Sequence, residues 1–457
     1  MMSGSAPGPR AAEAGGWAQA LAFLAAFHLP DLRKRIFVVL GMFGLYVITA
    51  HVPIPHISRA ELERIFQGGA GQLLGLLDVF AGGALRRFSI IALGVMPYIT
   101  ASILFQVLGY FVPPLQQLRR EGEYGRRKLS QYTRWTALGL AFFQAMFMLN
   151  TLLAGVVETG GGGLLHGILS PTTLYVAITL TAGVAFLMWM GEVITDKGIG
   201  NGISLIIFAG IILRLPDMMH EVYTFWQAGA YPTINVLVYF AAFLLTIALI
   251  VSVSQAHRRI PVQHARRQVG RQIVSSASTF LPIRVNTAGV MPIIFAMSLL
   301  YFPAQIVTAL QASLSSDVSL QLGKYLNWLM PTTVPGSLIY FLLVVSFTFF
   351  YTAIVFNVEE VSDNLKKQNS VVPGYRPGKQ TTEYLGRVLE RVTLAGGLFL
   401  ALIALTQYWV PHWTKVTTQY SALIGGTSIL IVVGVALDTM QQIEAHLVMR
   451  HYEGFLK

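Results

Sequence analysis

Long apolar runs separated by short polar segments dominate the pattern along this chain. We mark ten apolar segments: 36–52, 88–111, 132–154, 173–191, 202–215, 233–253, 286–308, 335–357, 388–410 and 427–449. A helix needs about 20 apolar residues to cross the hydrocarbon core of a bilayer. Nine of the ten segments reach or approach that length, whereas 202–215 is short and would need tilt or shielding by protein. The pattern predicts an all-α polytopic membrane protein with ten transmembrane helices.

Two further apolar stretches are too short to span a bilayer. Residues 17–29 lie just before the basic run at 33–35, which is typical of an interfacial helix, so we expect 1–35 to form an N-terminal cytoplasmic segment. Residues 68–87 are leucine-rich, punctuated by glycine, and precede a strong span. Irregular backbone at membrane depth is tolerated only inside protein or beside a water-filled cavity. We therefore predict a re-entrant or broken helix at 68–87.

The order of the spans suggests two halves. We divide the chain into an N-terminal half, 36–215, with five spans, and a C-terminal half, 216–457, with the other five. Because each half holds an odd number of spans, the two would be inverted relative to each other, which is a common design for proteins with a central pathway. This division rests on the span count alone.

Charge adds an orientation to this picture. Hydrophobic residues make up 54% of the 457 residues, charged residues 12%, and the formal net charge is +11. If the loops are numbered alternately inside and outside, one set holds 25 of the 32 Lys and Arg residues. The other set holds seven: Arg59, Arg64, Arg86, Arg87, Arg214, Lys324 and Lys415. The positive-inside rule assigns the rich set to the cytoplasm, so we expect both termini there.

Two of the cytoplasmic loops, 254–285 and 358–387, are longer and more basic than orientation alone requires. The first is entirely free of acidic residues, and the second contains Pro-Gly pairs on both sides of Arg376, which predict tight turns that project this side chain. We therefore expect both loops to bind anionic or acidic partners. The candidate docking residues are Arg258, Arg259, Arg266, Arg267, Arg271, Arg376 and Lys379.

Candidate catalytic chemistry is scarce. The chain has no cysteine, no HExxH zinc pattern, no Walker-type phosphate loop and no histidine in the middle of a span. Asp438 is the clearest acid inside a span, and a lone acid is more often structural than a proton carrier. We therefore expect neither an enzyme, nor a metal site, nor a cofactor. A secondary transporter of small solutes remains the alternative, although it needs a polar binding site near the bilayer midplane.

Several long motifs resemble those of the SecY family of bacterial protein-conducting channels, from about Arg33 to the end of the chain. They include FAGGALRRFSIIALGVMPYITASI (80–103), GEVITDKGIGNGISLIIFAGI (191–211), LPIRVNTAGVMPIIFA (281–296), NVEEVSDNLKKQNSVVPGYRPGKQT (357–381) and GGTSILIV (425–432). Shorter matches are PIPHI (53–57), EGEYGRRKLSQYTR (121–134) and RRIPVQHARRQVGRQ (258–272).

The resemblance implies ten helices in two halves around an hourglass pore, closed at its waist by a ring of aliphatic side chains. By motif position the pore ring is Val95, Ile99, Ile203, Ile207, Ile294 and Ile431. A half-helix would plug the pore from outside, and its apolar residues are Leu73, Leu74, Leu76, Leu77, Val79 and Phe80. A lateral gate toward the lipid would include the polar residues Thr100 and Asn286.

The resemblance also implies a function and partners. The family passes unfolded secretory polypeptides across the bacterial cytoplasmic membrane and releases hydrophobic segments sideways into lipid. Its partners are the SecE and SecG subunits, the SecA motor ATPase, the ribosome, which docks through ribosomal RNA on the basic loops, signal-sequence-bearing polypeptides and membrane lipids. Here the stretch before Arg258 lacks the acid that the family often has, and GRQ at 270–272 replaces a more basic triplet. These departures bear on docking and not on the fold.

Overall fold

The chain is described from a computed structural model. The residues described are 29–55, 62, 66, 78, 81–151, 170–264, 268–269, 272–273, 279–300, 328–414 and 426–454. Within these ranges the chain is mainly helical, which confirms the predicted all-α class. The interfacial helix expected at 17–29 and the six predicted plug residues lie outside the described residues.

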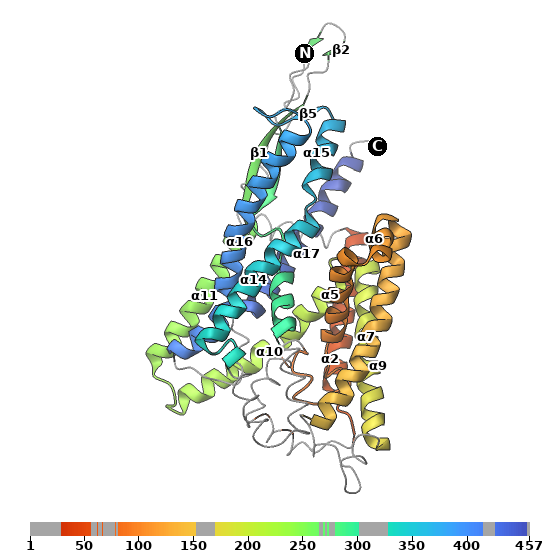
Figure 1. Cartoon of the computed structure of the whole chain (residues 1–457). Coiled ribbons are helices and arrows are strands. Elements are labelled where there is room, and N and C mark those ends of the chain that lie inside the picture. The colour runs from red at the N-terminus through yellow and green to blue at the C-terminus, as the bar shows by residue number, and fades with distance from the viewer. Residues whose placement is uncertain are drawn as a thin grey trace.

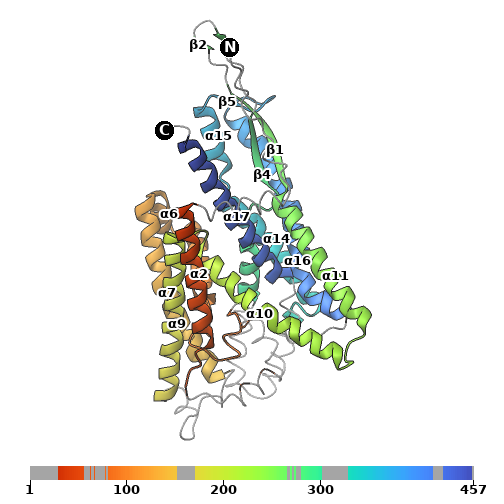
Figure 2. The ribbon, with the colours of Figure 1, turned by 180° about the vertical axis from the view of Figure 1, so that it is seen from behind.

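The helices form two groups (Figure 1). The first group is α2 (Pro30–His51), α5 (Met96–Phe111), α6 (Pro113–Arg120), α7 (Glu123–Thr151) and α9 (Pro171–Lys197), followed by α10 (Gly202–Gln227). The second is α11 (Thr233–Gln255), an apolar helix Met291–Leu300, α14 (Val334–Val355), α15 (Val358–Lys367), α16 (Lys379–Thr414) and α17 (Gly426–Gly454). The view from behind shows α10 running between the two groups (Figure 2).

Helix starts follow local sequence signals. Proline occupies the first turn of α2, α5, α9 and α14, where its missing N–H is not needed. The side chain of Ser170 accepts a hydrogen bond from the Thr173 N–H at the start of α9, and Asn201 accepts from the Ile203 and Ser204 N–H groups at the start of α10. These caps satisfy backbone donors that the helices themselves leave unpaired.

Six of the described helices are long and apolar enough to cross a membrane, and α5 with α6, bent by 101°, makes a seventh if the pair counts as one broken span. The chain is thus a multi-pass membrane protein. Each of the ten predicted segments overlaps a helix of the described residues. The count of ten membrane crossings itself stays a prediction.

Two predicted boundaries were wrong. The span expected at 88–111 begins only at Met96, because residues 81–95 form a series of turns in which Gly94 has a φ of +58°. The span expected to end at 215 continues to Gln227, through Pro216. Arg214, near the predicted end, is buried and paired inside the protein. The proposed boundary between the halves therefore falls within α10.

A small sheet is formed within the two long basic loops, where the sequence suggested only turns. β1 (His257–His264) pairs antiparallel with β4 (Thr279–Arg284), from His257 opposite Arg284 to Val262 opposite Thr279. β5 (Ser370–Val371) adds to the other edge of β1, so the order is β4-β1-β5. β2 (Gln268–Val269) and β3 (Gln272–Ile273) form a separate two-stranded pair.

One large buried apolar cluster joins residues of both helix groups. Close packing depends on glycine at particular contacts: a Cβ at Gly183 in α9 would lie 2.0 Å from the Ile90 carbonyl oxygen, and one at Gly426 in α17 would lie 1.7 Å from that of Ile403. A second cluster contains Leu32 and Ile36 of α2 and Ile443 of α17. The start of α2 and the later part of α17 therefore lie on the same side of the molecule, as an even number of crossings requires.

Candidate pore and docking surface

The six aliphatic residues of the predicted pore ring come from four helices of both groups. Val95 caps α5 and Ile99 lies one turn into it, whereas Ile203 and Ile207 lie on consecutive turns of α10. Ile294 belongs to the helix Met291–Leu300 and Ile431 to α17. All six are associated with one large apolar cluster: five belong to it with at most 5% of their surface exposed, and the sixth, Ile203, packs against it. That they form a closed ring stays a prediction.

The aliphatic nature of these six side chains determines what they can do at a constriction. Flexible aliphatic side chains offer no hydrogen bonds, so they can close around one another without binding a polar chain specifically. A narrow apolar constriction also gates ions by losing its water. An arrangement of this kind can act as a seal between two aqueous sides.

The two predicted gate residues do not contact each other through a hydrogen bond. Thr100 donates its hydroxyl to the Met96 carbonyl oxygen, one turn earlier on its own helix, at 3.0 Å. The side-chain oxygen of Asn286 is buried and accepts no hydrogen bond from any described residue. The assignment of both residues to a lateral gate stays a prediction.

A buried ion pair that we did not predict joins Asp78 to Arg214 of α10. Asp78 Oδ2 lies 2.8 Å from Arg214 Nη1, and the two side chains are only 1% and 6% exposed. Asp78 Oδ1 also accepts the N–H groups of Leu85 at 3.0 Å and Arg86 at 3.1 Å. An unpaired charge at this depth would be strongly unfavourable, so each residue depends on the other. The available sign was the pair itself: one acid in a leucine-rich segment and one arginine late in an apolar run.

The predicted docking residues that the structure describes lie on one platform, made by the small sheet with α15 and α16. Its apolar base joins the sheet to α15 and α16 through Ile260, Ile283, Val372, Leu385 and Leu389. Arg258, Arg259, Arg376 and Lys379 are exposed on it. Arg266, Arg267 and Arg271 lie outside the described residues. The end of the molecule that carries α15 and the sheet is also the end where α17 finishes (Figure 1).

The backbone around Arg376 is held firmly while its side chain is exposed. Gly374 and Gly378 have φ values of +88° and +102°, so the turns predicted from the two Pro-Gly pairs are confirmed. The Arg376 carbonyl accepts the Thr381 hydroxyl at 2.8 Å. The neighbouring Tyr375 stacks on Tyr384, with ring centroids 4.1 Å apart. This loop presents the exposed Arg376 side chain from a backbone that is held in place.

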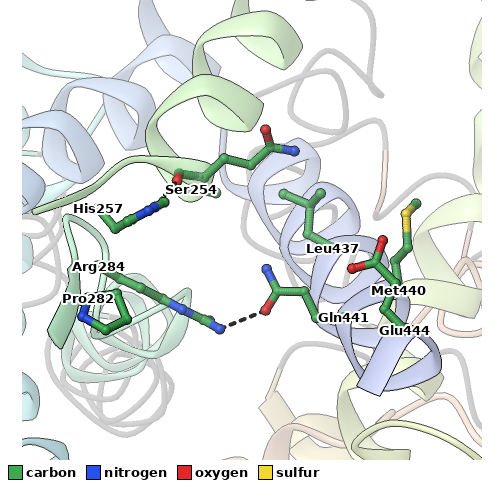
Figure 3. Close-up of a pocket in the computed structure, with 9 residues that line it drawn as sticks. Ser254, His257, Pro282, Arg284, Leu437, Met440, Gln441 and Glu444 are labelled. Carbon is green, nitrogen blue, oxygen red and sulfur yellow. Dashed lines mark hydrogen bonds between the residues drawn. The ribbon is translucent and has the colours of Figure 1, made fainter. Parts of the chain in front are cut away.

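A pocket of about 340 Å³ separates the sheet from α17 (Figure 3). Arg284, the last residue of β4, points across it, and its Nη2 donates to Gln441 Oε1 at 2.7 Å. The other guanidinium nitrogen, Nη1, lies 3.8 Å from the carboxylate of Asp438. The acid that the sequence marked as intramembrane is thus an exposed partner of Arg284 at the base of the platform.

Comparisons with known proteins agree with this architecture. The family model described as SecY matches residues 89–440. The protein translocase subunit SecY of Streptomyces scabiei is 41% identical over 446 residues, covering 95% of this chain and 99% of the relative. That of Thermotoga maritima is 42% identical over 441 residues, covering 95% and 97%.

Solved structures show the same fold at low sequence identity. One is described as the structure of a protein conducting channel, at 17% identity and a TM-score of 0.60, covering 93% of this chain and 97% of that one. Another is Sec61 in the canine ribosome-channel complex from the endoplasmic reticulum, at 16% identity and a TM-score of 0.58, with the same coverage. With the family model spanning most of the chain and relatives above 40% identity over nearly all of it, the chain belongs to the SecY family.

Proposed function

We propose that this chain is the channel through which unfolded secretory polypeptides cross a membrane and from which hydrophobic segments pass sideways into lipid. The observation that supports the proposal is that six aliphatic side chains, from four helices of both groups, belong to one large buried apolar cluster or pack against it. A seal made by both halves can widen when they move apart and close again when they return. The protein-conducting channels among the structural neighbours share this fold.

In this mechanism the aliphatic ring is the waist of the pore. The segment that includes Leu73, Leu74, Leu76, Leu77, Val79 and Phe80 acts as its plug. The lateral gate opens beside Thr100 and Asn286, where no hydrogen bond joins the two side chains. A signal sequence opens it by burying apolar surface, at about 25 cal/mol per Å².

The cytoplasmic platform is the proposed docking surface. Arg258, Arg259, Arg376 and Lys379 are exposed, and the fixed turn around Arg376 lowers the entropic cost of forming a charged contact. Ribosomal RNA phosphates and acidic patches of the SecA motor are its partners, with Arg266, Arg267 and Arg271 extending the surface. Two structural neighbours are ribosome-bound channels, which supports the ribosome as a partner of this chain. SecE and SecG complete the complex.

We place the chain in the bacterial cytoplasmic membrane with both termini in the cytoplasm. The loop charges support this orientation, since 25 of the 32 basic residues fall on one set of loops. The platform and the end of α17 lie together at one end of the molecule, in keeping with it (Figure 1).

The test is site-specific crosslinking to a precursor stalled in transit. A photoreactive residue at Ile99 should form an adduct that depends on ATP and on an intact signal sequence, because this side chain faces the buried ring. The matched control is Leu104, which lies on the same helix with 44% of its surface exposed and should contact lipid instead. If the intact complex gives no adduct at Ile99, or equal adducts at Ile99 and Leu104, the assignment of Ile99 to the pore is wrong.

A further inference from the structure

The turn segment Ala81–Ser89 is attached to α10 by more than apolar contact. Its residues Ala81, Ala84, Leu85 and Phe88 are at most 2% exposed and belong to the same cluster as the ring. Just before it, Asp78 forms the buried ion pair with Arg214 and accepts two backbone N–H groups of the segment. Asp78 therefore binds the segment through two backbone hydrogen bonds and α10 through the ion pair.

The attachment uses the face of α10 that carries the ring. Ile203, Ile207, Gly210 and Arg214 follow at spacings of four, three and four residues, which places them on one side of a helix. Gly82, with a φ of +65°, approaches so closely that a Cβ on it would lie 2.6 Å from the Gly210 Cα. Arg214 lies seven residues beyond Ile207, about 10 Å along the axis. The segment is thus held directly beyond the ring.

A third contact fixes the other side of the segment. The Tyr46 hydroxyl on α2 donates to the Ala81 carbonyl oxygen at 3.2 Å, and its oxygen would be 2.4 Å from a Cβ on Gly82. The segment is therefore enclosed between α2 and α10, and it cannot move outward from the ring without separating Asp78 from Arg214.

The energetics make this contact a switch of two states. A buried ion pair adds little to stability when it is intact. Separating its two charges inside the protein is strongly unfavourable, because each is then buried without a partner. The charges can separate cheaply only if water reaches both. Displacement of the segment and hydration of the space beyond the ring must then occur together.

We propose that the Asp78–Arg214 ion pair is a latch that holds segment 81–89 beyond the pore ring while the channel is closed. The latch rests on the proposed channel function and adds to it a specific pair of positioning residues. It keeps the closed state dry and releases only when a translocating chain admits water.

Ion leak through the reconstituted full-length complex tests the latch. Asp78→Asn keeps the size and one acceptor oxygen but removes the charge, and should raise ion leak at least tenfold in planar bilayers. Arg214→Lys, which keeps the charge, should leak no more than the parent. Asp217→Asn is the matched control. It removes a second ion pair between α10 and segment 81–89, that of Asp217 with Arg87 at 3.3 Å, whose side chains are about half exposed. Because water already reaches this pair, Asp217→Asn should leave the leak unchanged.

The double variant Asp78→Asn/Arg214→Gln covers the case in which Asp78→Asn fails to accumulate. With no lone charge left buried it should fold, and it should still leak, because the latch is absent. Parental leak in both Asp78→Asn and the double variant would overturn the latch. Precursor translocation in the same vesicles separates the two proposals: a parent complex that translocates nothing contradicts the channel function, whereas normal translocation with unchanged leak contradicts only the latch.

Discussion

Shortening one side chain of the pore ring should open the channel to ions. Ile207 is 4% exposed on the ring face of α10, and Ile207→Ala removes three carbon groups. Each buried carbon group contributes about 0.8 kcal/mol, so the closed ring loses about 2.4 kcal/mol relative to an open state in which this side chain meets water. Since each 1.4 kcal/mol is roughly tenfold in an equilibrium constant, the open fraction rises by up to roughly 50-fold.

Leu205 provides the matched control for this experiment. It is a buried aliphatic residue of α10, 5% exposed, and it lies two residues from both Ile203 and Ile207, which places it on the opposite side of the helix from them. Leu205→Ala should cost a similar amount of packing stability, about 2–5 kcal/mol, without widening the ring. Thermal unfolding in detergent should therefore show comparable losses for the two variants.

The assay is single-channel and macroscopic conductance of the reconstituted complex in planar bilayers, without precursor. We expect frequent openings for Ile207→Ala and parental behaviour for Leu205→Ala. Equal leak in the two variants would mean that conductance follows general loosening of the core and not the ring. Parental conductance in Ile207→Ala would remove this residue from the seal.

Two further predictions address docking and packing. Arg376→Glu should leave assembly intact and slow precursor export several-fold, because it reverses the charge on a fixed turn. Arg127→Glu, which changes an arginine that is 83% exposed on α7, should not slow export. Normal export from Arg376→Glu would contradict the docking role. Gly183→Ala should lower the unfolding temperature, since its Cβ would lie 2.0 Å from the Ile90 carbonyl oxygen. Gly139→Ala on α7, whose Cβ would meet nothing within 4 Å, should stabilise its helix by up to about 1 kcal/mol. Equal unfolding temperatures for the two variants in detergent would contradict the packing argument.

The helices could be predicted from the sequence because lipid leaves the backbone few choices. A segment in hydrocarbon must satisfy its own hydrogen bonds, so each apolar run of sufficient length becomes a helix. The turns at Gly374 and Gly378 were also local in origin, since Pro-Gly pairs favour them. The pore ring could not be selected by periodicity. Pairs such as Ile203 and Ile207 resemble dozens of others, and only the family motif distinguished them.

The remaining features depend on contacts between distant residues. Asp78 and Arg214 are 136 positions apart, and neither is distinctive until the fold brings them within 2.8 Å. The strand β1 was missed for a similar reason: its partners, β4 and β5, lie in different parts of the chain, and basic residues concealed the apolar residue Ile260 that faces the platform base.

Paired arginines occur on both sets of loops. Arg87 and Arg214 count among the seven basic residues of the sparse set and each has an acidic partner, but so do Arg134 and Arg284 of the rich set. Pairing therefore does not explain the asymmetry of 25 to seven, and the positive-inside rule counts Lys and Arg alone. The two sets differ instead in burial: Arg376 of the rich set is exposed on the platform, whereas Arg214 of the sparse set is buried against Asp78.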